Sequence, residues 1–351
     1  MLERKLLQEK ERSSGLFSRI FRKMDGCDVQ IVLDGKGEAD MVRVDDPVDN
    51  TCELLYVYSG DEPVNGKVML TPKGSYRHNG VDVQLLASIT TRSAGDNKVE
   101  FISQTKHFEP DTLQGPTPLQ FSFTAPKEYE SFRGISLLVT YHLCVVIHRP
   151  IKNVTERMEL WVTRVDTKLS ESQPDASRHR SYFRETVFGP LSTTMDVGVA
   201  DLLHIEFKYD KKYFHLQERV LGKVTFKVTH MDICHGEVAV TRTETVMPPL
   251  VESEVVHSET LQKFEIMDGT PIVGEVVPIR LYLKAIPNLT PTYMNIRECA
   301  SVQYSLNLVL ITSEGKRFFK HQKIELYRRT GQESLTTTAW RQDGADEKSK
   351  E

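Results

Sequence analysis

Apolar and polar residues alternate along much of this chain, and this period of two constrains the fold more than any other feature of the sequence. The segment 222–229 is an example. There, Val224, Phe226 and Val228 would share one face of an extended strand, whereas lysines and threonines occupy the positions between them. This pattern is typical of an antiparallel strand with one face in a core and the other in water.

A richer version of the pattern runs from residue 136 to residue 147, where one face is wholly apolar and the other is only partly polar. We interpret this segment as a central strand of a β-sandwich. Further strand-like runs are separated by turn-forming clusters, with no helical pattern between them. They span residues 29–33, 54–58, 81–89, 99–105, 119–123, 158–165, 204–207, 260–266, 279–283, 302–311 and 318–327. Many short strands without alternating helices indicate an all-β fold built from sandwiches.

The length of 351 residues is too great for one ordinary core and suits two domains. Alternation disappears between residues 166 and 194, where Ser, Arg, Asp and Pro are common, and the last residues are polar. We therefore predict five parts: an N-terminal extension (1–24), a first sandwich (25–165), a linker with an inserted loop (166–194), a second sandwich (195–330) and a disordered tail (331–351).

The composition and charge of the chain argue against several classes of function. The formal net charge is −4, with Lys and Arg scattered among acidic residues, so neither a nucleic-acid binder nor a bulk electrostatic grip on an acidic membrane is indicated. The first residues do not resemble a signal peptide, and no apolar run approaches the roughly 20 residues that span a bilayer. The five cysteines are scattered and odd in number, as expected for reduced thiols. We expect a cytosolic protein.

Residues that could carry chemistry are sparse. The sequence has no phosphate-binding glycine motif and no Cys-x-x-Cys pair. His142 and Cys144 would share one face of a strand, but roughly 7 Å apart, so a packed Cys beside a hydrogen-bonded His is favoured over a nucleophilic pair. His230 and His235 are favoured as surface histidines over a zinc pair. We expect no catalytic, cofactor or metal site, and a protein that is not an enzyme.

Six segments resemble the vacuolar protein sorting-associated protein 26 family, the arrestin-like small subunit of the retromer coat. The most specific is Glu265-Ile266-Met267-Asp268-Gly269-Thr270-Pro271, within the similar segment 264–271. The others are residues 28–33, 129–134, 202–209, 274–281 and 304–310. The resemblance covers roughly residues 16–330 in the order of the family. The segment 168–190 looks like an insertion relative to the family, and the residues before Gly15 look like an additional extension.

The resemblance implies two arrestin-like β-sandwich domains joined by a linker, and a role in recycling cargo from endosomes to the Golgi or plasma membrane. It implies binding to the α-solenoid subunit, vacuolar protein sorting-associated protein 35, and through it to the metallophosphoesterase-fold subunit. PX-domain sorting nexins and the cytosolic tails of transmembrane cargo are the other implied partners. The expected location is the cytoplasm and the cytosolic face of endosomes, with indirect membrane association and no cofactor.

Two docking sites follow from the resemblance. The first, for the solenoid subunit, comprises Ile266, Met267, Asp268, Gly269, Thr270, Pro271, Gly274 and Val277. The Ile-Met pair just before a tight Asp-Gly turn is a candidate anchor, because turns are normally polar. The alternative is that Ile266 ends a strand inside the core.

The second site, for cargo and a sorting nexin, comprises Thr194, Met195, Asp196, Val197, Gly198 and Phe319. An edge strand there would accept an extended peptide, and Val197 and Phe319 would line a pocket for one side chain. Alternatively, Val197 packs between the domains and Phe319 belongs to the core. Phe318 and Phe319 cannot share one face of a strand, so one of them must point outward.

Two other classes of function remain to be weighed. An arrestin-type adaptor for phosphorylated receptors, acting outside retromer, would need a buried polar core and a basic groove, and the sequence shows no cluster of Arg and Lys. An enzyme on a sandwich fold would need a catalytic cluster, which is not evident.

Overall fold

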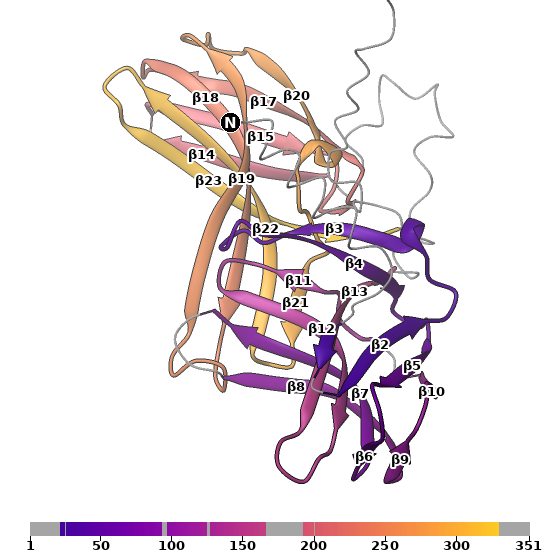
Figure 1. Cartoon of the computed structure of the whole chain (residues 1–351). Helices are drawn as coiled ribbons and strands as arrows, with labels where there is room; N and C mark the ends of the chain where they lie inside the picture. Colours follow the sequence, from indigo (N-terminus) through magenta and orange to yellow (C-terminus); the bar gives the residue numbers. More distant parts are fainter. Residues whose placement is uncertain are drawn as a thin grey trace, which may run out of the picture. The chain divides into compact units, whose positions relative to one another are not determined.

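The structure, a computed structural model, describes residues 22–24, 26–92, 97–124, 127–165, 192–199 and 201–329. Within these ranges the chain is built from strands and two short 3₁₀ helices, η1 (Glu38–Asp40) and η3 (Leu283–Ala285), with no α-helix (Figure 1). None of its described helices is therefore long and apolar enough to cross a bilayer. The all-β prediction is confirmed.

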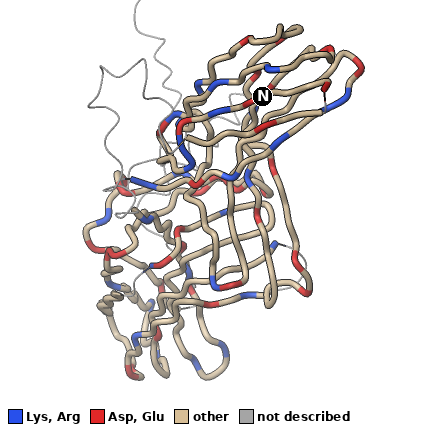
Figure 2. Tube along the Cα trace, turned by 180° about the vertical axis from the view of Figure 1, so that it is seen from behind, with Lys and Arg blue, Asp and Glu red and all other residues tan. Residues whose placement is uncertain are grey.

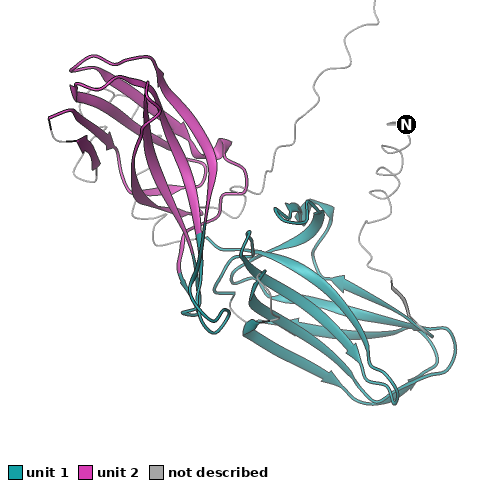
Figure 3. Ribbon diagram, turned by 90° about the vertical axis from the view of Figure 1, so that its left-hand side faces the viewer, with its two compact units in different colours: residues 1–165, 244–257, 295–301 teal, residues 166–243, 258–294, 302–351 magenta. Residues whose placement is uncertain are grey.

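The chain divides into two compact units (Figure 3). Unit 1 comprises residues 1–165, 244–257 and 295–301, and unit 2 comprises residues 166–243, 258–294 and 302–351. Two segments from the C-terminal half of the chain thus belong with the N-terminal half. Most of the predicted extension and linker, and all of the predicted tail, lie outside the described residues, so these remain predictions.

Unit 1 contains two main sheets. The four-stranded sheet has the order β1 (Arg22–Met24), β2 (Cys27–Leu33), β5 (Val64–Pro72) and β10 (Thr117–Phe123). The larger sheet has the order β3 (Met41–Asp45), β4 (Cys52–Ser59), β13 (Val154–Thr163), β12 (Leu137–Ile147), β7 (Val81–Thr91) and β8 (Lys98–Phe108), with β11 (Phe132–Arg133) beside β12. A short ribbon pairs β6 (Tyr76–His78) with β9 (Asp111–Leu113).

Strand β12 forms the centre of the larger sheet, as the sequence predicted. It pairs along its whole length with β7, from Leu137 opposite Thr91 to Ile147 opposite Val81. Its six inward residues are at most 1% exposed. Each such apolar side chain contributes roughly 1.5–3 kcal/mol to folding relative to full exposure, which explains why this run is apolar.

Unit 2 is the second sandwich. Its four-stranded sheet has the order β14 (Thr193–Val199), β15 (Leu203–Tyr209), β17 (Arg219–Thr229) and β20 (Val276–Tyr282). The other sheet has the order β16 (Tyr213–His215), β23 (Arg317–Tyr327), β22 (Ala300–Thr312), β18 (Ile233–Val246) and β19 (Val255–Asp268), with β21 (Tyr293–Ile296) beside β22. One end of each of β18, β19, β21 and β22 falls within the segments 244–257 and 295–301 of unit 1. Strands β14 and β19 are therefore edge strands of their described sheets.

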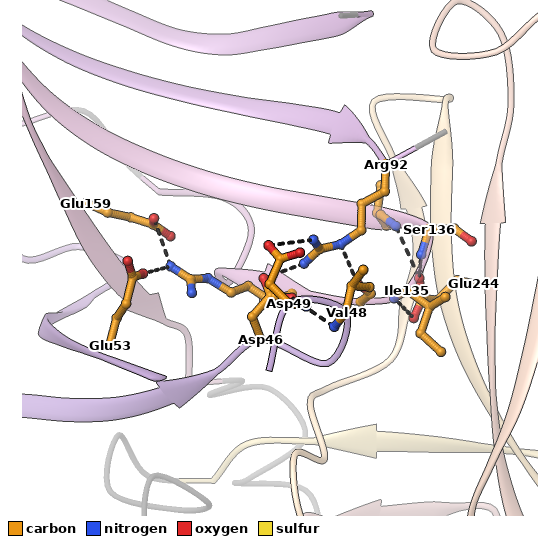
Figure 4. Close-up of polar contacts among 12 residues, drawn as sticks. Asp46, Val48, Asp49, Glu53, Arg92, Ile135, Ser136, Glu159 and Glu244 are labelled. Carbon is orange, nitrogen blue, oxygen red and sulfur yellow. Dashed lines mark hydrogen bonds and ion pairs between the residues drawn. The ribbon is translucent and has the colours of Figure 1, made fainter. Parts of the chain in front are cut away.

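A buried acid holds the segment 244–257 in unit 1. Glu244, at 1% exposure, accepts hydrogen bonds from the backbone N–H groups of Ile135 (3.1 Å), Ser136 (2.8 Å) and Leu137 (3.2 Å) (Figure 4). A Cβ atom on Gly134 would collide with the same carboxylate. Because Gly134 has no side chain, the carboxylate of Glu244 can approach the backbone just before β12.

Strand β17 provides a test of the inward and outward faces. Phe226 is fully buried, whereas its neighbour Lys227 is exposed. Replacing Phe226 with Asp would bury an unpaired charge and remove a core aromatic ring, so we expect the free energy of unfolding to fall by roughly 3 kcal/mol or more. Chemical denaturation measures this change.

Lys227→Ala is the matched control, because it removes only an exposed ion pair with Glu206 (2.6 Å). We expect this variant to change stability by less than about 1 kcal/mol. Equal stability of Phe226→Asp and Lys227→Ala would show that the faces of β17 are assigned wrongly.

Candidate docking sites

Ile266 and Met267 lie side by side over a glycine of the neighbouring strand. A Cβ atom built on Gly236 of β18 would be 2.8 Å from Met267 Cγ and 3.4 Å from Ile266 Cγ1. Both side chains are half-buried. Consecutive residues of a regular strand point to opposite faces, so the approach of both side chains to one glycine indicates that the alternation of β19 is interrupted here, as in a β-bulge. This irregularity places two large apolar side chains on the same side of the strand.

The chain then turns sharply between β19 and β20. Gly269 has φ +114° and donates its N–H to the carbonyl of Cys234 (2.8 Å). Further on, Gly274 has φ +86°, and the N–H of Glu275 donates to the carbonyl of Ile272 (3.1 Å). Positive φ at the third residue of a four-residue turn but not at the second, here Val273, is typical of a type II turn, for which glycine is favoured. The positive φ angles therefore explain why glycine occupies positions 269 and 274.

The type II turn presents apolar side chains to solvent. Ile272 is 73% exposed and Val273 is 59% exposed, and Val276 nearby is also exposed. Sequence reasoning did not include Ile272 and Val273 in the site, although an apolar pair inside a glycine-bounded turn is unusual. The predicted residues differ in exposure: Pro271 is buried, Ile266, Met267 and Val277 are half-buried, and Asp268, Gly269, Thr270 and Gly274 are exposed. We call residues 266–277 the β19–β20 segment.

The predicted cargo strand is an edge strand in the described sheet. β14 pairs with β15 on one side, with Val197 opposite Ile205. Thr194, Asp196 and Gly198 are exposed, whereas Met195 and Val197 are 2% and 6% exposed and point inward. The backbone of β14 is therefore the accessible feature of this edge, and the Val197 side chain is buried.

Phe319 is the outward residue of the Phe318–Phe319 pair. It is 71% exposed, on β23 opposite Val309, whereas Phe318 is half-buried. β14 and β23 belong to different sheets of unit 2 but contact each other. A shallow depression near the end of β14 is lined by Gly198, Val199, Asp201, Leu203, His204 and Val228. The predicted residues thus lie on two strands that contact each other. That they line one pocket for a cargo side chain remains a prediction.

The pair considered for nucleophilic chemistry is in the wrong protonation states for it. Burial raises the pKa of the Cys144 thiol. Burial also lowers the pKa of His142 to about 4, and the positive charges of Arg157 and Lys98 act in the same direction. Near neutral pH the thiol is therefore protonated and the imidazole is neutral, which is the opposite of an activated thiolate–imidazolium pair.

Unit 1 contains a buried polar cluster, the feature that an arrestin-type adaptor would need. Arg92 forms an ion pair with Asp46 (2.5 Å) and donates from Nε to the carbonyl of Gly134 (2.8 Å). Nearby, Arg133 pairs with both Glu53 (2.6 Å) and Glu159 (2.9 Å) (Figure 4). Both arginines are already bound by carboxylates.

Acids outnumber these two arginines, since Asp49 and Glu244 lie in the same cluster (Figure 4). Along the described trace, Lys and Arg are interspersed with Asp and Glu in both units (Figure 2). Phosphate recognition needs free cationic donors gathered at one place. The polar cluster is therefore explained by stability, and the charge pattern does not favour a phosphate groove.

The two β-sandwich units define an arrestin-like scaffold, whose described residues include an exposed apolar turn and an edge strand. Comparison with known proteins agrees. The family profile described as vacuolar protein sorting-associated protein 26 matches residues 24–315. The chain belongs to the vacuolar protein sorting-associated protein 26 family, a family of protein-sorting components.

Individual relatives cover most of the chain. It is 34% identical over 310 residues to vacuolar protein sorting-associated protein 26 of Dictyostelium discoideum, covering 86% of this chain and 82% of the relative. It is 33% identical over 287 residues to protein 26B of Mus musculus, covering 80% and 79%. The Schizosaccharomyces pombe protein 26 is 32% identical over 277 residues, covering 78% and 86%. The family resemblance seen in the sequence is confirmed.

The glycine under Met267 allows a direct test of the bulge. Gly236→Val would place a side chain where Met267 now lies, so we expect Met267 to move and the free energy of unfolding to fall by about 1–3 kcal/mol. The methyl resonance of Met267 in an NMR spectrum reports the movement. Gly115→Ala is the control, because its added Cβ meets nothing within 4 Å. An unshifted Met267 resonance in Gly236→Val would contradict the described packing.

The low pKa of His142 predicts a pH dependence. An unfolded histidine titrates near pH 6.5, and burial lowers the pKa of folded His142 to about 4. Between these values the unfolded chain binds a proton that the folded chain does not, so stability present above about pH 6.5 is lost as the pH falls toward 4. Urea denaturation should show a smaller acid-induced loss for His142→Gln than for the wild type.

His230→Gln serves as the control for this experiment, because His230 is exposed. It should retain the acid sensitivity of the wild type. If His142→Gln loses as much stability in acid as the wild type, His142 is not a buried neutral group.

Proposed function

We propose that this protein is a non-enzymatic subunit of the retromer coat. It binds the N-terminal part of the α-solenoid subunit, vacuolar protein sorting-associated protein 35, and through it joins the metallophosphoesterase-fold subunit. It also helps PX-domain sorting nexins to capture the cytosolic tails of transmembrane cargo for recycling to the Golgi or plasma membrane. The observation that carries the proposal is the exposed apolar β19–β20 segment, in a chain of this family.

The β19–β20 segment has the properties of a docking surface for a helical partner. Ile272 and Val273 are exposed between two backbone hydrogen bonds that fasten the segment to neighbouring strands. The N–H of Gly269 donates to a carbonyl of β18, and the N–H of Gly274 donates to the carbonyl of Phe226 in β17 (2.7 Å). A rigid turn loses little conformational entropy on binding. Half-buried Met267 and Ile266 provide further apolar surface a few residues earlier in the chain, as a binding hot spot requires.

The cargo site uses a different mode of recognition. The backbone of β14 offers hydrogen-bonding groups to an extended peptide, which would add a strand to the sheet. Phe319 supplies an exposed aromatic face on the neighbouring strand β23. One apolar anchor contributes about 1–3 kcal/mol, so capture is weak and depends on the sorting nexin.

The site of action that follows is the cytoplasm and the cytosolic face of endosomes. The formal net charge of −4 provides no bulk attraction to acidic lipids, so membrane association is indirect and comes from the partners.

An arrestin-type receptor adaptor outside retromer is the second candidate. The buried polar cluster around Arg92 and Arg133 is the feature that such an adaptor would share, but carboxylates already bind both arginines, so an incoming phosphate would have to displace them. Phosphate-dependent binding of a phosphorylated receptor tail, without the solenoid subunit, would favour this candidate over the coat.

Two variants test the proposal together. Ile266→Asp combined with Met267→Asn places polar groups in the apolar surface, so we expect affinity for the purified solenoid subunit to fall by about 100-fold or more. Phe319→Ala should leave that affinity unchanged but weaken recruitment of a cargo tail in the presence of sorting nexin. Calorimetry measures the first interaction and pull-down measures the second.

Phe319→Ala is a sharper probe than Val197→Asn, because Val197 is buried and an amide there would disturb the fold. Normal solenoid binding by the folded double variant would exclude the β19–β20 segment as the site. Loss of both interactions in Phe319→Ala, or of neither, would exclude two separate sites.

A further inference from the structure

Three side chains of unit 2 converge at the end of β19. His235 comes from β18, and Glu265 and Asp268 come from β19. One imidazole nitrogen and one oxygen from each carboxylate all lie within 4.8 Å of one another. His235 is half-buried, and both acids are exposed.

The interrupted alternation of β19 at Ile266 and Met267 explains this convergence. In a regular strand, Glu265 and Asp268 would point to opposite faces, because they are three positions apart. Ile266 and Met267 both cover Gly236 instead, so the two acids that flank them come to the same side as His235. The arrangement is a consequence of the local fold and was not visible in the spacing of the sequence.

The cluster has more acid than base. Neither Glu265 nor Asp268 forms an ion pair with a Lys or Arg of the described chain. A third acid, Glu237, places Oε2 3.9 Å from Nε2 of His235, and Lys263 pairs with the other oxygen of Glu237 (3.2 Å). A divalent cation would supply the positive charge that Glu265 and Asp268 lack.

We propose that His235, Glu265 and Asp268 bind a late first-row divalent cation of the Zn²⁺ type. An imidazole ligand favours such ions over Ca²⁺ and Mg²⁺, which take oxygen ligands. Bonds of about 2.0–2.2 Å between the cation and each ligand atom require the three ligand atoms, now within 4.8 Å of one another, to move closer together. The exposed side chains of Glu265 and Asp268 have room for this adjustment, and water or Glu237 completes a four-coordinate site.

A bound cation would hold the ends of β18 and β19 together. Because its ligands Glu265 and Asp268 lie on either side of Ile266 and Met267, it would also reduce the motion of that pair. This effect is a property of the fold and does not depend on which partner the β19–β20 segment binds.

Calorimetric titration of the full chain with Zn²⁺ tests the site. The Cys52→Ser background removes an exposed thiol that could bind the ion elsewhere. We expect saturable binding of one ion at this site, and a loss of about tenfold or more in affinity for the His235→Gln, Asp268→Asn double variant. His230→Gln, which changes an exposed histidine outside the cluster, should bind like the parent.

Hydrogen exchange gives a second readout. Zn²⁺ should slow exchange of the backbone amides of residues 265–269 in the parent but not in the double variant. The proposal is overturned if the parent shows no saturable binding up to about 1 mM Zn²⁺, a limit far weaker than that of built zinc sites. It is also overturned if the double variant binds as tightly as the parent, or if Zn²⁺ leaves exchange of residues 265–269 unchanged.

Discussion

Unit 1 includes a segment from the C-terminal half of the chain, and the hydrogen bonds of Glu244 attach that segment to the rest of the unit. Glu244 accepts them from three successive backbone N–H groups at the start of β12. A buried carboxylate is costly unless it is paired or hydrogen-bonded, and here the backbone supplies the donors. Further bonds secure the same region: the side-chain amide of Asn97 donates to the carbonyl of Leu250 (3.0 Å), and the N–H of Met247 to that of Cys299 (2.8 Å). The segments 244–257 and 295–301 thereby become part of unit 1.

In unit 2 the corresponding constraint is the absence of a side chain at Gly236. The space above this glycine accommodates both Ile266 and Met267, and the interrupted alternation of β19 follows. Two features of the end of β19 follow from that irregularity: the paired apolar side chains and the approach of Glu265 and Asp268 to His235. Bulges commonly occur at sheet edges, where they redirect side chains toward a function.

The surfaces proposed for binding lie on edge strands and turns, while the interiors of both sandwiches are conventional apolar cores. Phe319 and Ile272 stand out because they are large apolar residues exposed at 71% and 73%. Some buried polar groups, such as Arg92 and Asp46, bind one another and stabilise the scaffold. Phe319 and Ile272 are thus distinct from the buried residues that hold the fold, whereas Ile266 and Met267 also pack on Gly236.

Alternation in the sequence predicted many of the strands and their inward faces, because alternation is a local property: β12 and Phe226 of β17 lie as predicted, whereas β18 was not among the predicted strands. The family also followed from short sequence segments. Tertiary structure alone decided that Phe319 points outward, that Val197 is buried and that Ile266 and Met267 share one side of β19. Each of these depends on which strand lies opposite. Pairing between distant segments, such as Glu244 with residues 135–137, is set by contacts that no local pattern records.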